Sequence, residues 1–186
     1  MADMSSTEED SSKLSKNQVM GSSIPPGEHS VSPFLTVNNG SKAIDFYKRA
    51  FNAEELFRET MQDGKKILHA RIRIGDSIVR LSDEFAGSPH KSPASLGGAT
   101  TVTLHIYTEN VEALWQQAVQ AGAIVIMPLD NQFWGERYGI LSDPFGHHWS
   151  MSMAIKMSPE EMAAKRKAIM SMLSEGEHPG RETENI

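Results

Sequence analysis

The chain has 186 residues, no cysteine and a formal net charge of −6. Without cysteine it can form no disulfide, thiolate metal site or cysteine nucleophile, and no apolar run approaches the roughly 20 residues that a membrane helix requires. The acidity is confined to the two ends, because residues 31–173 hold 15 acidic and 15 basic side chains, and no basic cluster predicts a nucleic-acid partner.

Residues 1–30 are rich in serine, acidic residues, glycine and proline. Such a composition cannot bury enough apolar surface to offset the cost of ordering, so we predict a disordered N-terminal tail. The tail has no apolar stretch of the kind that a signal peptide needs. We therefore expect a cytoplasmic protein that has no membrane partner.

A first compact unit is predicted from about residue 31 to residue 85. Its expected elements are the strand SPFLTV (32–37), the helix SKAIDFYKRAFNAEE (41–55), and the strands KILHARIRIG (66–75) and SIVRLSD (77–83). Alternation in the third element places four apolar side chains on one face of the strand, namely Leu68, Ala70, Ile72 and Ile74. The opposite face then carries His69, Arg71 and Arg73.

After a glycine- and proline-rich linker at 86–99, a second unit repeats this order over residues 100–153. Its expected elements are TVTLHIYT (101–108), the helix NVEALWQQAVQAGA (110–123), IVIMPL (124–129), RYGILSD (137–143) and HHWSMSM (147–153). The two copies are about 70 residues apart, a spacing typical of a duplicated supersecondary unit. Asp143 is expected to order the DPFG turn of the second copy through its side chain.

A C-terminal helix is predicted within residues 156–173. Ser158 is a suitable N-cap, Pro159 suits the first helical position, and Glu161 completes a capping box. Its apolar stripe predicts docking on the same domain or on a second subunit. Residues 174–186 are predicted to form a second disordered tail, for the same compositional reason as the first.

The two units, the sequence FYKRAF in the first helix and the phrase DNQFWGERYGILSDPFGHHWSM (130–151) together resemble the vicinal oxygen chelate (VOC) superfamily. The similarity is greatest to PhnB-like members of the glyoxalase/bleomycin-resistance/dioxygenase type and covers about residues 31–155. The resemblance implies an α+β fold in which two βαβββ modules form a cupped eight-stranded mixed sheet, followed by the C-terminal helix. It also implies a homodimer with a small-molecule pocket.

Metal-dependent members of this superfamily carry histidine and glutamate ligands on the first and last strands of each module. When the motifs are aligned, the four ligand positions hold Ser32, Arg80, Thr103 and Ser150. Neutral hydroxyls are poor ligands for divalent zinc, nickel, iron or manganese, and a protonated arginine repels such an ion. We therefore predict that the usual metal site is absent and that no cofactor is required.

Without a metal, the cup is expected to hold a medium-sized organic ligand against aromatic and polar side chains. The expected ligand-binding residues are Phe34, Arg80, Tyr107, Trp134, Arg137, Tyr138 and Ser150. The two arginines suit a carboxylate or phosphate group at one end of the ligand. If a reaction is catalysed, His105 is the first candidate for the general acid or base, and His69 is the second.

Three functions stay open at this point. The leading hypothesis is a metal-independent binding protein, or an enzyme of unassigned reaction that uses the same pocket. The second is a metal-dependent glyoxalase-like lyase or isomerase, or a dioxygenase, with a displaced site made of His69, His105 and His148. The third is a non-catalytic dimeric scaffold whose acidic tails bind a partner.

Overall fold

The computed structural model describes residues 24–25 and 27–175. The first module consists of β1 (Phe34–Val37), α1 (Gly40–Phe51), β2 (Glu54–Thr60), β3 (Ile67–Ile74) and β4 (Ser77–Asp83). The second consists of β5 (Thr103–Tyr107), α2 (Val111–Ala121), β6 (Ile124–Asn131), β7 (Glu136–Ser142) and β8 (His148–Ala154). A short 3-10 helix, η1 (Pro93–Leu96), lies between the modules, and α3 (Pro159–Ser174) follows them. Most of the two predicted tails, residues 1–23 and 176–186, lies outside the described residues.

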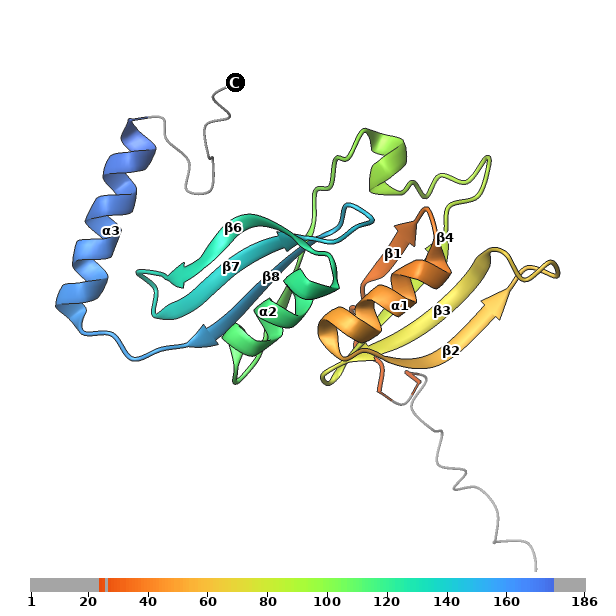
Figure 1. Cartoon of the computed structure of the whole chain (residues 1–186), viewed down its shortest axis with the longest axis horizontal. Helices are drawn as coiled ribbons and strands as arrows, with labels where there is room; N and C mark the ends of the chain where they lie inside the picture. The colour runs from red at the N-terminus through yellow and green to blue at the C-terminus, as the bar shows by residue number, and fades with distance from the viewer. Residues whose placement is uncertain (1–23, 26, 176–186) are drawn as a thin grey trace, which may run out of the picture.

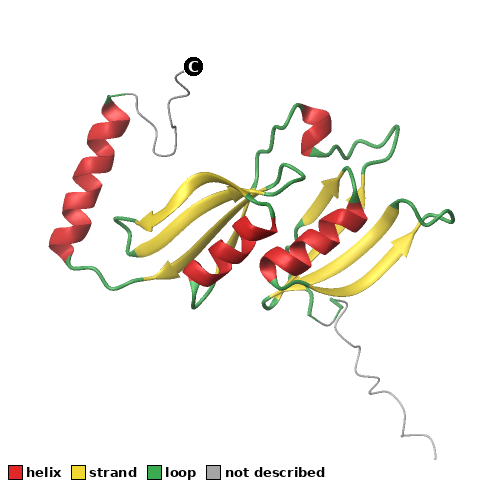
Figure 2. Ribbon diagram, in the orientation of Figure 1, coloured by secondary structure: helices red, strands yellow, loops and turns green. Residues whose placement is uncertain are grey.

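Each module folds into its own four-stranded mixed sheet. The strand orders are β1-β4-β3-β2 and β5-β8-β7-β6. In each sheet the first and last strands of the module pair in parallel, and the other neighbours pair antiparallel. Figures 1 and 2 show the modules side by side, with α1 and α2 on the same side of the two sheets. The predicted α+β fold is confirmed, with the eight strands divided into two sheets of four.

A shared aromatic core joins the two modules on the helix side. Tyr47 and Phe51 of α1 lie against Trp149 of β8, with ring centroids 5.4 and 4.7 Å apart. Phe46 meets Phe145, in the turn between β7 and β8, at 6.2 Å. All five side chains are buried. These aromatic residues of the two motifs therefore hold the modules together by burying aromatic surface.

The first module contains a strand, β2, that the family resemblance implied but that the residue pattern did not locate. The helix was expected to continue through Glu55, but α1 ends at Phe51, and Asn52 adopts the left-handed conformation with a φ of 55°. Asparagine tolerates this conformation better than most residues and commonly ends helices in this way. The following residues pair antiparallel with β3. Their glutamates favour a helix, and it is the pairing with a neighbouring strand that overrides this preference.

The simple alternation of buried and exposed side chains expected along β3 fails at the start of the strand. Ile67 is buried and Leu68 is exposed, the reverse of the prediction for Leu68. The pairing with β2 shifts in register at this end, and a bulge of this kind turns side chains to the other face. From Ala70 to Ile74 the predicted alternation holds.

Helix α3 begins with the predicted capping box. The Ser158 side chain accepts a hydrogen bond from the Glu161 N–H, and the Glu161 carboxylate accepts one from the Ser158 N–H. None of the described residues of α3 is buried, and Figure 1 shows the helix standing away from both sheets. It contacts the second module where the Arg166 guanidinium lies 5.2 Å from the centre of the Phe133 ring. Within residues 24–25 and 27–175, no helix is long and apolar enough to cross a membrane.

Replacement of Gly139 by alanine is expected to lower the free energy of unfolding by about 1–3 kcal/mol, the usual cost of overpacking a core. A Cβ atom at this buried position of β7 would lie 2.6 Å from Trp115 Cζ3 and 3.0 Å from Leu129 Cα. Helix α2 would have to shift to admit it. Chemical denaturation measures the loss. In a Trp115→Leu background the same substitution should cost less, and an equal cost would contradict this explanation.

Candidate functional site

His105 lies at the centre of the face of the second sheet that carries no helix. We call this surface the second open face and define it by His105, Tyr107, Tyr138, Ser150 and Ser152. His105 Nδ1 is 2.7 Å from Ser150 Oγ, and His105 Nε2 is 3.1 Å from Ser152 Oγ. A neutral imidazole satisfies both contacts, because one nitrogen donates, the other accepts, and a hydroxyl can do either. Ser152 was not predicted, although strand alternation places it on the same face as Ser150.

Three aromatic side chains gather around His105. Tyr138 of β7 stacks on the imidazole with centroids 5.9 Å apart and planes at 17°. Tyr107 meets the imidazole edge-on at 4.3 Å, and Trp134 meets Tyr138 edge-on at 5.6 Å. Tyr107 is 73 % exposed and Trp134 is 44 % exposed, so aromatic surface remains available to a flat or cationic ligand. Five of the predicted residues, including Ser150, are thus brought together.

Two histidines are held in the neutral state by their surroundings. Burial lowers the pKa of His105 below its ordinary value, and the nearby Glu136 carboxylate opposes this shift. Burial also lowers the pKa of His69, and the positive charges of Arg80 and Arg71 add to the effect. Both imidazoles are therefore uncharged at neutral pH and able to accept a hydrogen bond or a proton.

The protein is expected to lose stability as the pH falls below about 6.5, the ordinary histidine pKa. His69 and His105 have lower pKa values in the folded chain than in the unfolded chain. Between those two values the unfolded chain binds more protons, so acidification favours unfolding. Urea unfolding at pH 7.5 and pH 5.5 measures the effect. A double His69→Gln, His105→Gln variant should show a smaller loss, and an equal loss would assign it to other groups.

Arg137, another predicted ligand-binding residue, does not lie on the second open face. It adjoins Tyr138 in β7, and successive residues of a strand point to opposite faces of the sheet. Its guanidinium forms an ion pair with Glu112 of α2 and donates a hydrogen bond of 3.1 Å to Asn131 Oδ1. Arg137 therefore ties α2 to the sheet on the helix side.

The corresponding surface of the first sheet carries a row of aromatic and basic side chains. The strand register aligns Phe34 with Arg80, Arg80 with Arg71, and Arg71 with Phe57. We call this row, together with His69, the first open face. Arg80 Nη2 donates a hydrogen bond of 2.9 Å to Glu28 Oε1. Glu28 belongs to the stretch that was expected to be disordered, and no motif in the sequence marks it as part of a site.

The three histidines proposed for a displaced metal site are not brought together within this chain. His69 lies on the first open face, 5.9 Å from the Phe34 ring and 6.0 Å from the Phe57 ring. His105 is on the other sheet, and His148 begins β8 opposite Thr103. In the part of the chain that the structure describes, no three histidine, aspartate or glutamate side chains are grouped so that they could hold a metal ion.

The residues at the four family ligand positions do not fit a divalent cation either. Ser32 precedes β1 and donates its hydroxyl to Glu28 Oε2 at 3.0 Å. Arg80 is paired with the same carboxylate, and Ser150 Oγ is engaged with an imidazole nitrogen. With Thr103 as the fourth, the set offers a guanidinium and three neutral hydroxyls. It contains neither the imidazole nor the carboxylate that such ions prefer.

A cavity of about 620 Å³ lies where the two modules meet. Its lining includes Thr103, His105 and Tyr107 of β5, together with Ser32 and Asp76 from the first module. This volume is typical of small-molecule sites, and such sites are often found between domains or modules. The cavity therefore gives a ligand access to His105 and Tyr107.

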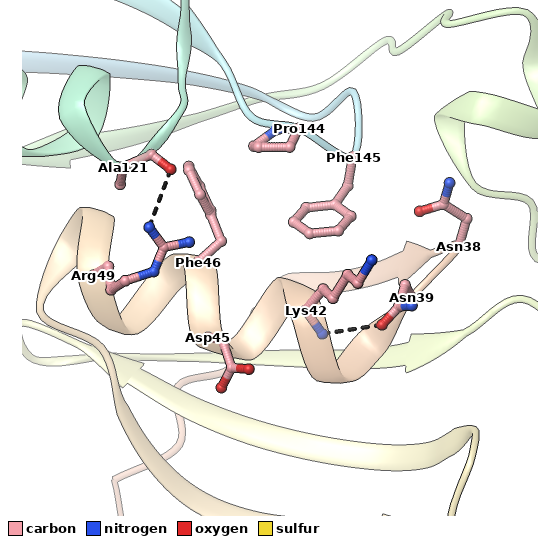
Figure 3. Close-up of a pocket in the computed structure, with 9 residues that line it drawn as sticks. All are labelled: Asn38, Asn39, Lys42, Asp45, Phe46, Arg49, Ala121, Pro144 and Phe145. Carbon is pink, nitrogen blue, oxygen red and sulfur yellow. Dashed lines mark hydrogen bonds between the residues drawn. The ribbon is translucent and has the colours of Figure 1, made fainter.

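A second cavity, of about 670 Å³, lies on the helix side between α1 and the β7–β8 turn. Figure 3 shows Phe46 and Phe145 facing each other across this space, and Asp45 is also part of its lining. Arg49 donates a hydrogen bond of 3.3 Å to the Ala121 carbonyl at one side. Its lining contains no histidine, and its two phenylalanines belong to the core that joins the modules. We therefore place the candidate site in the cavity beside His105.

Comparison with known proteins agrees with this fold. The family profile described as Glyoxalase/Bleomycin resistance protein/Dioxygenase superfamily matches residues 29–151. An uncharacterized protein of Mycobacterium bovis is 45 % identical over 132 residues, which cover 69 % of this chain and 86 % of that protein.

Solved structures share this fold. TioX from Micromonospora sp. ML1 is 26 % identical with a TM-score of 0.53, and the match covers 70 % of this chain and all of TioX (100 %). The PhnB protein from Bacillus cereus has the same fold at 18 % identity and a TM-score of 0.53, with 68 % of this chain and 100 % of that chain covered. Because the profile spans both βαβββ modules, the chain belongs to the Glyoxalase/Bleomycin resistance protein/Dioxygenase superfamily.

Proposed function

We propose that this chain binds a medium-sized, flat aromatic molecule on the second open face, without the divalent metal of the metal-dependent members. The observation that supports this most is the environment of His105, whose two ring nitrogens are both bonded to serine hydroxyls. Exposed aromatic rings surround that polar centre. An aromatic wall with a few convergent polar groups is the usual composition of an organic-ligand pocket.

The same arrangement makes His105 the best-placed group for proton transfer, if the bound molecule reacts. Burial keeps its pKa low, so the neutral ring can accept a proton near neutral pH. Ser150 and Ser152 fix the orientation of the ring. His69, the second candidate, lies among the aromatic rings of the first open face and has no serine pair of this kind in the described residues.

We also propose that two copies of the chain form a cytoplasmic homodimer. Phe34 is 50 % exposed and Phe57 is 39 % exposed on the first open face, and Tyr107 and Trp134 are exposed on the second. If the first open face of one copy covered the second open face of its partner, both aromatic surfaces would be buried and two cups would be completed. A chain without cysteine suits a reducing compartment. Light scattering that gives the mass of a single chain would contradict the dimer.

Thermal unfolding with acridine orange, a flat aromatic cation, tests the proposed binding. In the presence of EDTA the melting temperature should rise with dye concentration, because a ligand that binds only the folded state stabilises it. Zinc, nickel, iron(II) or manganese alone should leave the melting temperature unchanged. A metal-induced rise that is lost in His105→Ala would support the metal-dependent lyase, isomerase or dioxygenase instead. No response to dye or metal would support the scaffold hypothesis.

A further inference from the structure

The first open face contains a carboxylate that belongs to the chain itself. A tight turn, closed by a 3.0 Å hydrogen bond from the Glu28 N–H to the Pro25 carbonyl, includes Gly27 at a φ of 78°. This turn directs the Glu28 side chain onto the sheet, where it is only 3 % exposed. Its Oε1 accepts from Arg80 Nη2 at 2.9 Å and lies 3.7 Å from Arg71 Nη1.

The two arginines belong to the sheet, whereas the glutamate does not. Arg71 of β3 and Arg80 of β4 are direct register partners on antiparallel strands. Like charges placed opposite one another destabilise such a pair, so the site requires an anion between them. None of the described residues from 24 to 32 lies in a helix or strand, so Glu28 can leave without breaking a strand ladder. The sheet therefore provides a permanent cationic site, and the segment before β1 provides the carboxylate that occupies it.

The occupant does not use all of the binding capacity of the site. Two guanidinium groups face one carboxylate, which leaves one positive charge of the cluster uncompensated. Arg80 Nε is buried and has no hydrogen-bond partner among the described residues. The hydrogen bond from Arg80 holds the pKa of Glu28 below its ordinary value, so this carboxylate is ionised at neutral pH. The site thus binds one carboxylate, that of Glu28. Arg80 Nε remains as a donor for another carboxylate that could bind the guanidinium through two hydrogen bonds.

Aromatic rings flank the arginines at both ends of the row. The Arg71 guanidinium lies 5.7 Å from the centre of the Phe57 ring, and Phe34 stands beside Arg80 in the register. A cavity of about 600 Å³ is lined by Glu28, Phe34 and Arg80 among other residues. A ligand that joined a carboxylate to an aromatic ring would match both the charge and the walls of this space.

We propose that Arg71 and Arg80 form a binding site for the carboxylate of an aromatic acid, and that Glu28 is a built-in competitor which the ligand displaces. This inference deepens the proposed function, since it names the chemistry of one end of the ligand, and it rests on that function in assigning the two open faces to one cup. The test of this proposal changes residues of the first open face alone. A negative result there therefore differs from a negative result with acridine orange, which tests the second open face.

The probe is benzoate, and its binding is measured by NMR from the shift of the Arg80 Nε–Hε resonance during a titration. In the unmodified protein, benzoate should shift this resonance, and benzyl alcohol, which has the same ring without the charge, should not. Glu28→Gln should raise the benzoate affinity about fivefold or more, because no carboxylate of the chain then competes with benzoate for Arg71 and Arg80. Arg80→Met in the Glu28→Gln background, followed through the Nε–Hε resonance of Arg71, should abolish binding.

Glu54→Gln is the matched control. Glu54 pairs with Arg73 on the same sheet, so the variant removes one carboxylate from an arginine without touching the proposed site, and benzoate affinity should not change. An unchanged benzoate affinity in Glu28→Gln, or equal binding of benzyl alcohol, would overturn the proposal. Inorganic phosphate that binds as well as benzoate would overturn its aromatic part. If Glu28→Gln unfolds, the titration of the unmodified protein still decides, since an unmoved Arg80 resonance rejects the site.

Discussion

Replacement of Asp143 by alanine is expected to lower the free energy of unfolding by about 3–5 kcal/mol, since each buried donor left without a partner costs about 1–3 kcal/mol. The Asp143 side chain is 3 % exposed. Its Oδ1 accepts hydrogen bonds of 2.9 Å from the Phe145 and His147 N–H groups. Its Oδ2 accepts from the Tyr47 hydroxyl at 2.8 Å and from Trp149 Nε1 at 2.9 Å. The substitution therefore breaks the turn and the contact between the modules together.

The tyrosine partner makes this result easy to separate from a general packing defect. Burial, followed by the charge of Asp143, raises the pKa of Tyr47 well above its ordinary value, so the hydroxyl stays protonated and donates. Tyr47→Phe removes one of the four hydrogen bonds and should cost about 1 kcal/mol. Asp45→Ala, on the exposed side of α1, is the control and should change stability by less than about 0.5 kcal/mol. Urea unfolding that showed a loss below about 1 kcal/mol for Asp143→Ala would contradict the assigned role.

The second large effect is expected on ligand affinity. Trp134→Ala and Tyr138→Ala should each weaken acridine orange binding about tenfold or more, which corresponds to about 1.4 kcal/mol. Trp134 and Tyr138 meet edge-on, and Tyr138 stacks on His105, so each substitution removes aromatic surface beside His105. Aromatic residues of this kind commonly dominate binding energy when they line a pocket. Fluorescence titration of the dye measures the dissociation constant.

Leu96→Ala and Trp134→Phe are the controls for this experiment. Leu96 is an exposed apolar residue of η1, away from the second open face, and its loss should leave dye affinity unchanged. Trp134→Phe keeps an aromatic ring and should retain much of the affinity. Equal dye binding by Trp134→Ala, Tyr138→Ala and the parent protein would place the ligand elsewhere. The cavity beside Phe46 and Phe145 would then be the next site to examine.

Much of the candidate site could be predicted from strand periodicity. His105 and Tyr107 are two residues apart in one strand, and Ser150 and Tyr138 fall on the same face of the neighbouring strands. Arg137 is adjacent to Tyr138 in β7, so strand periodicity places it on the opposite face of the sheet. Two adjacent residues of a strand point to opposite faces of the sheet, so both cannot face the same ligand, whatever their chemistry.

The sequence by itself determined the duplicated order of elements and the N-terminal cap of α3. The Ser158 capping box is an example, because its hydrogen bonds join residues three positions apart and depend on local backbone geometry. The position of β2 required the structure, because a strand forms by pairing with a neighbour, and its glutamates point to a helix when taken alone.

Only the tertiary structure decided which distant side chains meet. Glu28 and Arg80 are 52 residues apart, and Tyr47 and Asp143 are 96 residues apart. It also placed His69 and His105 on different sheets, which separates the members of the displaced metal site. Contacts at such separations follow from how whole elements pack, and residue spacing along the chain carries no information about that packing.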